Sequence, residues 1–287
     1  MAVTTVRDIV WELDSRDGEA IPYVVFDPVI INDDAGFDSQ GVVTDRACLY
    51  SLQRLLDLEI RTGDMVNVES IGGGGVIPEV TDNYKGSKEE YVKIIARCPV
   101  CRSKLVEKTD ADGIKRLYCD NPLCEKKVLN RFKQFLWKEA VFIDGLSNDE
   151  EVLKSLVWNW YLINIPDLFT LFEKEEGLIS DCGFSVERFN KLIENINSVV
   201  GLVPLRKLIL GLVTPMLSLS AVDKLEAYIQ EKSEPGVPFV NLTKEEMLTA
   251  GLRNWEADVV EKWLAVKENV DLFKELYLIL TTGVVVK

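Results

Sequence analysis

The sequence predicts a multidomain α+β protein with a small β-barrel at one end, a cysteine-rich module in the middle and an all-α domain at the other end. Short β-branched and aromatic runs fill residues 1–84, and four cysteines in two close pairs follow. Apolar residues then recur at helical spacing in residues 139–287. A chain of 287 residues is also too long for one small core. We therefore expect three domains, over residues 1–84, 85–138 and 139–287.

Residues 1–84 are expected to form strands and one helix, with turn formers such as Asp27-Pro28 between the strands. The expected strands lie at residues 3–6, 9–11, 23–26, 29–31, 64–68 and 76–80. The helix is expected near residues 49–58, where apolar residues recur at helical spacing. These elements fit a small closed barrel, and the oligonucleotide-binding (OB) fold is the commonest barrel of that kind.

The four cysteines predict a zinc site, because they arrive as Cys98-x2-Cys101 and Cys119-x4-Cys124. Four soft thiolates suit the tetrahedral shell that Zn²⁺ prefers in structural sites. The 17 residues between Cys101 and Cys119 suffice for a short hairpin that folds the second pair back onto the first. Four unrelated buried thiols, or two disulfides, are the alternatives. The tight pairing argues against both.

The charge of the chain is unevenly distributed. The net charge is -14, yet residues 85–138 carry 14 Lys and Arg against 7 Asp and Glu, whereas residues 1–84 carry 5 against 16. A basic stretch around a metal site can concentrate phosphate contacts on one face. Lys126, Lys127 and Arg131 are the candidates for such contacts. A solvated lysine-rich hairpin is the alternative.

The chain is expected to be cytoplasmic (in the host cytoplasm if the source is viral) and to contain no membrane segment. Its first 14 residues lack the apolar run of a signal peptide. The most apolar segment, residues 202–219, contains Arg206, Lys207 and two prolines, which argue against a membrane span. Cys48 and Cys182 are then expected to be buried thiols.

Residues 139–287 are predicted to be helical throughout. The expected helices lie at residues 150–160, 186–199, 202–212, 220–229 and 255–280. Four glycines are expected to lie at joints between helices, at Gly145, Gly183, Gly211 and Gly251. Repeated helix–glycine–helix units are typical of helix-hairpin-helix (HhH) motifs, in which backbone N–H groups face a DNA phosphate. Ordinary C-caps of a helical bundle are the alternative.

The order of the modules resembles the C-terminal two-thirds of NAD⁺-dependent bacterial DNA ligases. Segments of the barrel resemble that family's motifs in order, at residues 12–21, 27–29, 45–50, 63–66 and 76–80. Within this set, residues 45–50 resemble the start of the family's barrel helix. Residues 124–146 follow the family without a gap from the fourth cysteine to its Ile-Asp-Gly-Leu-Gly motif, and they include Arg131.

The resemblance implies roles for individual residues. It assigns the four cysteines to a structural zinc site, Arg16 and Arg46 to contacts at a nick in duplex DNA, and Gly183 to a phosphate-binding hairpin. The basic candidates around the zinc site become DNA contacts in the same way. Departures weaken the match, because Glu69-Ser70 replace a pair of arginines, and hairpin glycines are replaced by Ser147, a residue near Leu217 and Asn254.

The family's chemistry lies in an adenylation domain, whose lysine in a Lys-x-Asp-Gly motif takes AMP from NAD⁺. These 287 residues contain neither that motif nor histidine. The resemblance therefore implies a DNA-binding and clamping subunit of an NAD⁺-dependent ligase, split as in some bacteriophages and without catalytic residues of its own. Its partners would be nicked double-stranded DNA and a separate adenylation subunit that binds NAD⁺ and Mg²⁺. A non-catalytic nucleic-acid adaptor in DNA replication or repair is the alternative.

Overall fold

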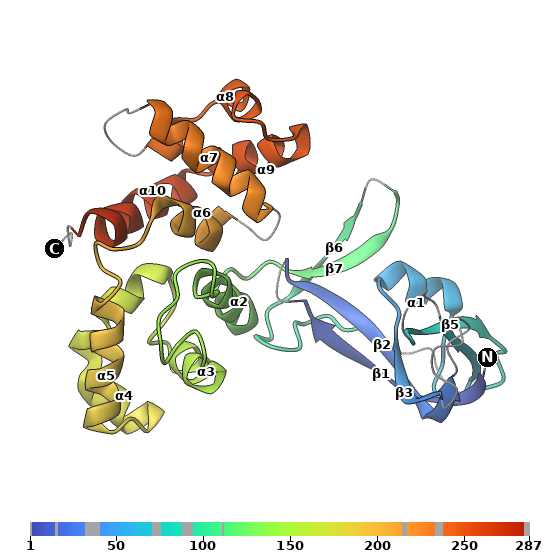
Figure 1. Cartoon of the computed structure of the whole chain (residues 1–287). Coiled ribbons are helices and arrows are strands. Elements are labelled where there is room, and N and C mark those ends of the chain that lie inside the picture. The colour runs from blue at the N-terminus through green and yellow to red at the C-terminus, as the bar shows by residue number, and fades with distance from the viewer. Residues whose placement is uncertain are drawn as a thin grey trace. The chain divides into compact units, whose positions relative to one another are not determined.

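The structure is a computed structural model that divides into two compact units, Met1–Lys127 (unit 1) and Val128–Lys287 (unit 2) (Figure 1). It describes residues 2–14, 17–31, 41–70, 76–87, 94–110, 112–213, 217–232 and 238–283. Antiparallel strands in unit 1 and helices in unit 2 confirm the mixed α+β class. The finer division into three domains stays a prediction.

In its described residues, unit 1 consists of an antiparallel sheet and one α-helix, α1 (Leu52–Leu58). Its strands are β1 (Ala2–Leu13), β2 (Glu19–Ile31), β3 (Val42–Cys48), β4 (Met65–Ser70), β5 (Pro78–Asn83), β6 (Leu105–Thr109) and β7 (Lys115–Cys119). The strand order is β5-β4-β1-β2-β7-β6, and β3 also pairs with β2. β3 and β5 come close to each other, although no ladder between them is described.

Several of the predicted strands fuse into longer ones. The runs at 3–6 and 9–11 are one strand, β1, and those at 23–26 and 29–31 are one strand, β2. The predicted turn at Asp27-Pro28 is therefore wrong. The pairing of β2 with β3 shifts register between Val25 and Val29, and this irregularity accommodates a proline that has no N–H to donate.

The helix expected near residues 49–58 is confirmed as α1, which begins at Leu52. Residues 45–50, which the resemblance places at the start of that helix, are not helical, because residues 42–48 form β3. Ser51 provides the N-cap, and its hydroxyl accepts a hydrogen bond from the Arg54 N–H at 3.1 Å. A hydroxyl in this position satisfies a backbone donor that the first turn leaves unpaired.

Two clusters of buried side chains stabilise unit 1. The first lies within the sheet and includes Phe26 and Ile31, which are 2% and 0% exposed. The second surrounds buried cysteines and includes Leu52 and Leu117. The indole of Trp11 packs against both clusters. The side chain of Trp11 therefore connects the cysteine-rich cluster with the core of the sheet.

Unit 2 is helical, with one buried core. The helix α2 (Glu125–Phe135) begins in unit 1 and continues into unit 2. The other helices are α3 (Glu150–Trp158), α4 (Glu175–Cys182), α5 (Val186–Asn197), α6 (Leu205–Val213), α7 (Leu219–Lys232), α8 (Lys244–Thr249), α9 (Asn254–Leu264) and α10 (Lys267–Tyr277). The described part of unit 2 also contains 3₁₀ helices at Ile165–Lys174 and Pro238–Asn241 and a π-helix at Leu278–Thr282. Of the helices in the described ranges, none has the length and hydropathy that crossing a bilayer requires.

Three of the four predicted glycine joints are confirmed. Gly145, Gly183 and Gly251 follow or link helices with positive φ values of 83°, 67° and 93°, a region that side chains rarely adopt. Gly211 is different, because it lies inside α6 rather than at a joint. A Cβ there would meet the ring of Phe135 at 3.1 Å, so this glycine allows two segments of the unit 2 core to pack closely.

Replacing Glu256 by glutamine is expected to destabilise unit 2 by about 2–3 kcal/mol at pH 7. Its carboxylate is 2% exposed and accepts hydrogen bonds from the backbone and guanidinium of Arg253 at 2.9 and 2.7 Å and from Ser218 at 3.3 Å. The bond from the Arg253 side chain, opposed by burial, lowers the pKa of Glu256 to about 2. The stabilisation is therefore present above the unfolded value of about 4.3 and is lost as the pH falls towards 2.

Urea unfolding of both forms at pH 7, 4 and 2.5 measures this difference. Glu246→Gln is the matched control, since Glu246 occupies the same position in the capping box of α8 but its side chain is 26% exposed. Solvent screening makes its expected loss smaller. A Glu256→Gln variant as stable as the wild type at pH 7 would contradict the expectation.

Candidate metal centre and the cations around it

Four cysteines come together in unit 1, and their sulfur atoms all lie within 4.8 Å of one another. Cys98, Cys119 and Cys124 are 0% exposed, and Cys101 is half-buried. Cys119 ends β7, and Cys124 immediately precedes α2. The antiparallel pairing of β6 with β7 returns the second pair of cysteines to the first, as the spacing predicts.

Local hydrogen bonds shape the first cysteine turn. The Cys98 N–H donates to the Ser103 carbonyl at 2.8 Å, and the Arg102 N–H donates to the Cys98 carbonyl at 3.1 Å. The Val100 N–H donates to the Cys98 sulfur at 3.4 Å. A backbone N–H aimed at sulfur stabilises a thiolate, which is the form that binds a metal.

The second cysteine turn depends on Asn121. Its side chain accepts a hydrogen bond from the Leu123 N–H at 3.0 Å, and its carbonyl accepts one from the Cys124 N–H at 3.3 Å. The following proline, Pro122, is exposed at the turn. An asparagine that bonds to the backbone two residues onward is typical of tight turns.

The thiols differ in acidity. Burial would raise the pKa of Cys101, but hydrogen bonds from Ser103 and Asn121 outweigh it and lower the value to about 6. Burial raises the pKa of Cys119 to about 11 and also raises that of Cys124. A soft divalent cation displaces the protons of such thiols when it binds. Four converging sulfur donors, with no oxygen or nitrogen donor among them, fit zinc.

All six cysteines are free thiols, so the alternative of two disulfides is not borne out. Cys48 and Cys182 are half-buried, and the expectation that they are buried is therefore wrong. Cys48 lies at the end of β3, where its sulfur accepts a hydrogen bond from the Tyr50 N–H at 3.3 Å. Cys182 ends α4, next to the glycine joint.

The metal centre is joined directly to the sheet. β7 pairs with the start of β2, where Glu19 is opposite Tyr118. The Cys119 N–H donates to the Gly18 carbonyl at 2.8 Å. Gly18 has a positive φ of 83°, and a Cβ there would come within 2.9 Å of the Cys119 carbonyl oxygen. The turn before β2 therefore needs a glycine in order to approach a metal ligand.

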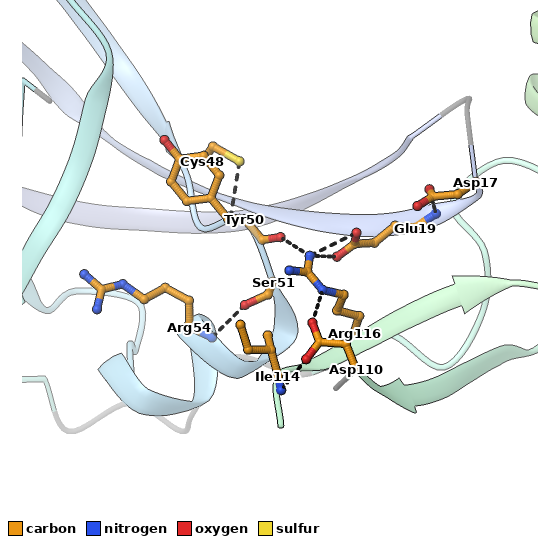
Figure 2. A network of polar contacts seen from close by, with 9 residues as sticks. All are labelled: Asp17, Glu19, Cys48, Tyr50, Ser51, Arg54, Asp110, Ile114 and Arg116. Atoms are coloured by element: carbon orange, nitrogen blue, oxygen red, sulfur yellow. Dashed lines mark hydrogen bonds and ion pairs between the residues drawn. The ribbon is translucent and has the colours of Figure 1, made fainter. Parts of the chain in front are cut away.

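An ion pair between a buried carboxylate and a half-buried guanidinium reinforces this junction (Figure 2). The Arg116 guanidinium on β7 donates to both carboxylate oxygens of Glu19 at 2.9 and 3.1 Å and to the Tyr50 carbonyl at 3.3 Å. Its Nε donates to Asp110 at 3.2 Å, and the Ile114 N–H also donates to that carboxylate at 2.9 Å. Burial raises the pKa of Glu19, although the bond from Arg116 acts in the opposite direction. One arginine thus connects the start of β2, the segment after β3 and the β6–β7 turn.

Of the two candidate nick arginines, Arg16 lies outside the described residues. Arg46 lies on β3 and is 44% exposed at its side chain. Its guanidinium donates to the Glu12 carboxylate at 2.9 Å and lies over the Tyr23 ring, 4.3 Å from the centroid. A phosphate at Arg46 would therefore compete with Glu12.

The basic candidates around α2 have different surroundings. Lys126 is exposed, whereas Lys127 is half-buried and its ammonium donates to the Cys119 carbonyl at 2.9 Å. Arg131 is exposed beside a cavity of about 510 Å³, which is also lined by carboxylates of α10 such as Glu268. Lys127 therefore helps to hold the segment around the cysteine cluster, and Arg131 lies near carboxylates.

In the hairpin before α3, local side chains already occupy backbone donors. The Ile143 N–H donates to the Ser147 hydroxyl at 2.9 Å, and the Gly145 N–H donates to the Asn148 side chain at 2.8 Å. Asp149 caps α3 and pairs with Arg188 at 2.9 Å. These N–H groups already have acceptors within the hairpin. The Asp149 carboxylate also occupies the N-terminus of α3, which is where a phosphate would bind.

In the hairpin before α5, the Gly183 N–H also has a partner, because it donates to the Leu178 carbonyl. A Cβ added at Gly183 would meet nothing within 4 Å. Ser185 caps α5, and its hydroxyl accepts a hydrogen bond from the Arg188 N–H at 3.2 Å. The Arg188 guanidinium lies 5.2 Å from the centroid of the Phe184 ring. Of the two hairpins, this one has more open space around its glycine.

Sequence reasoning passed over three cations of the first cysteine turn, Arg97, Arg102 and Lys104. All three are exposed. Their position beside Cys98 and Cys101 was the available signal, because a turn that binds a metal presents its remaining side chains to solvent.

The comparisons with known proteins lead to DNA ligases. No protein-family model matches the chain. It is 30% identical to the DNA ligase of Lachnoclostridium phytofermentans over 67% of its length, 34% identical to that of Nitratiruptor sp. over 69%, and 29% identical to that of Orientia tsutsugamushi over 84%. The chain spans 27%, 28% and 36% of those proteins. Most of its length is therefore similar to a part of proteins named DNA ligase.

Proposed function

We propose that the chain is the DNA-binding and clamping part of an NAD⁺-dependent DNA ligase and holds nicked duplex DNA. In this proposal a separate adenylation subunit, as in split bacteriophage ligases, supplies the lysine that accepts AMP and binds NAD⁺ and Mg²⁺. The similarity to DNA ligases over 67% and 69% of the chain carries the proposal. The zinc centre would be structural and would take no part in the chemistry.

The strand pairing of unit 1 supports an OB barrel within this proposal. β1 pairs with β2 and β4, β2 pairs with β3, and β4 pairs with β5. The approach of β3 to β5 would close this set, as in a five-stranded Greek-key barrel. Arg46 on β3 would then meet a phosphate at the nick, and the hairpin at Gly183 would hold a phosphate of the backbone.

Affinity capture of the tagged chain from cells that make it, followed by a nick-sealing assay on the eluate, tests this function. NAD⁺-dependent sealing, with AMP attached to a co-purifying protein and not to this chain, is expected. Sealing with ATP and not with NAD⁺ would overturn the cofactor assignment. A covalent AMP on this chain would overturn the assignment of adenylation to a partner.

A second candidate function is a non-catalytic adaptor that binds DNA in replication or repair. The hairpin before α3 favours it, because Ser147 and Asn148 occupy backbone donors that a clamp would direct at phosphate. An adaptor would bind nicked and intact duplexes and would co-purify with DNA-processing proteins. Its eluate would seal no nick with either cofactor.

Glu12→Gln is expected to tighten binding of nicked duplex about 2- to 5-fold, because an exposed ion pair is worth up to about 1 kcal/mol. The substitution removes the carboxylate that competes for Arg46. Asp27→Asn is the matched control, since it releases Arg7 on β1 from a similar exposed pair. Fluorescence anisotropy measures the affinity of both variants for nicked duplex and separates a specific role for Arg46 from a general effect of charge. Equal tightening would show a general charge effect instead of a role for Arg46.

A further inference from the structure

Three cations lie together on the first cysteine turn. We call residues 97–104 the basic turn. Arg97 and Lys104 form an isolated antiparallel bridge, so their side chains leave the backbone on the same face. The Arg97 guanidinium donates to the Arg102 carbonyl at 3.1 Å, which connects the third cation to the first.

The basic turn has no neutralising carboxylate among the described residues. Other cations of the zinc hairpin form ion pairs, as Lys108 does with Asp120 at 2.8 Å and Lys115 with Glu107 at 3.5 Å. No such pair is described for the basic turn. Two like charges directly opposite each other also destabilise a bridge. The charge of the turn therefore needs an explanation other than local stability.

The backbone at Arg102 adds to this argument. Its φ is +61°, in the left-handed region where glycine or asparagine is favoured. The bond from its N–H to the Cys98 carbonyl holds this conformation. An arginine here is unfavourable for the backbone, so its value lies in an exposed guanidinium, whose forked donors match two oxygens of a phosphate.

We propose that the basic turn binds phosphodiester groups of the duplex backbone, through Arg102 and Lys104 with Arg97 beside them. This inference deepens the proposed function and rests on it. Contacts to phosphate read no base, so the binding is independent of sequence. Each phosphate contact adds about 0.9 to the magnitude of the slope of log K against log salt concentration.

Salt-dependent binding of a nicked duplex to an Arg102→Gln/Lys104→Gln variant tests the inference. Arg97 is kept, because its guanidinium also holds the turn. The matched control is Lys108→Gln/Lys115→Gln, which removes the same charge from the same hairpin at cations that are already paired. We expect the first variant to bind at least 10-fold more weakly near 0.1 M salt, with a slope smaller by about 2, and the control to change less than about 2-fold.

The outcomes separate the inference from the function on which it rests. If the wild-type chain binds nicked duplex and both variants weaken equally, the inference is overturned and the proposed function stands. A wild-type chain that binds no duplex overturns both. Zinc bound to four thiolates carries about two negative charges, which the cations could instead neutralise. If the first variant loses zinc and the control keeps it, the cations serve to neutralise the zinc site, and the inference is overturned.

Discussion

Removing the metal from the four-cysteine centre is expected to unfold unit 1. A structural zinc contributes on the order of 10 kcal/mol to the folding of such a module. Whole domains are stable by only about 5–15 kcal/mol. Because the cysteine cluster shares Trp11 with the core of the sheet, the loss should extend from the zinc hairpin to β1 and β2. Hydrogen exchange during chelation should show these strands losing protection together.

Cys119→Ser should have the same effect as chelation, since Cys119 is a buried ligand whose N–H also bonds to the turn before β2. Cys48→Ser and Cys182→Ser are matched controls, because neither thiol belongs to the cluster. Both controls should keep the wild-type melting curve. Unit 2 has its own core and should keep its protection in all variants. Wild-type melting of Cys119→Ser would refute a structural metal.

Replacing Arg116 by methionine is expected to destabilise unit 1 by about 3–5 kcal/mol at pH 7, the cost of leaving a buried charge without its partner. Glu19 is 7% exposed and would lose both of its hydrogen bonds from the guanidinium. Urea unfolding followed at unit 1 measures the loss. Arg7→Met removes another ion pair from the same sheet. The side chains of that pair, Arg7 and Asp27, are 61% and 46% exposed, so the loss of stability should be much smaller.

The destabilisation caused by Arg116→Met should also be smaller at low pH than at pH 7. Burial already raises the pKa of Glu19, and without Arg116 nothing described opposes that rise. A carboxyl with a raised folded pKa binds its proton more tightly in the folded state. The variant therefore gains stability as the pH falls towards the unfolded value of about 4.3. Glu19→Gln with Arg116→Met should recover most of the loss, because it leaves no buried charge. A double variant as unstable as the single one would show that the charge is not the cause.

The clustering of the four cysteines could be predicted from the sequence because its signal is local. Two pairs of cysteines with short spacing have few uses, and the intervening hairpin needs no information from the rest of the chain. The helices α3, α5, α6 and α7 were predicted for the same reason, whereas α4 and α8 were not predicted, and the single helix expected at residues 255–280 is two helices, α9 and α10. The apolar spacing of the predicted helices is local, and residues such as Asp149 and Ser185 are favourable N-caps next to it.

Long-range contacts were not predictable in this way. The pairing of Glu19 with Arg116 connects positions that are 97 residues apart, and no spacing in the sequence indicates it. The same holds for Gly211, which resembles a joint in the sequence but lies against Phe135. Lys127 belongs to a basic stretch, yet its ammonium bonds to a carbonyl beside the metal. The sequence shows which side chains are charged, whereas the fold determines which group each charge contacts.

The junction between β2 and β7 affects the order in which the chain can fold. β2 leaves the ribosome well before Arg116, and at about 5–20 residues per second the interval of 97 residues takes roughly 5–20 s. During that time Glu19 has no partner, and the start of β2 lacks the neighbour that it has in the finished sheet. Closing so long a loop is slow, and an unpaired strand edge invites aggregation. The sheet of unit 1 therefore reaches its final pairing only after the β6–β7 hairpin and the cysteines beside it have been synthesised.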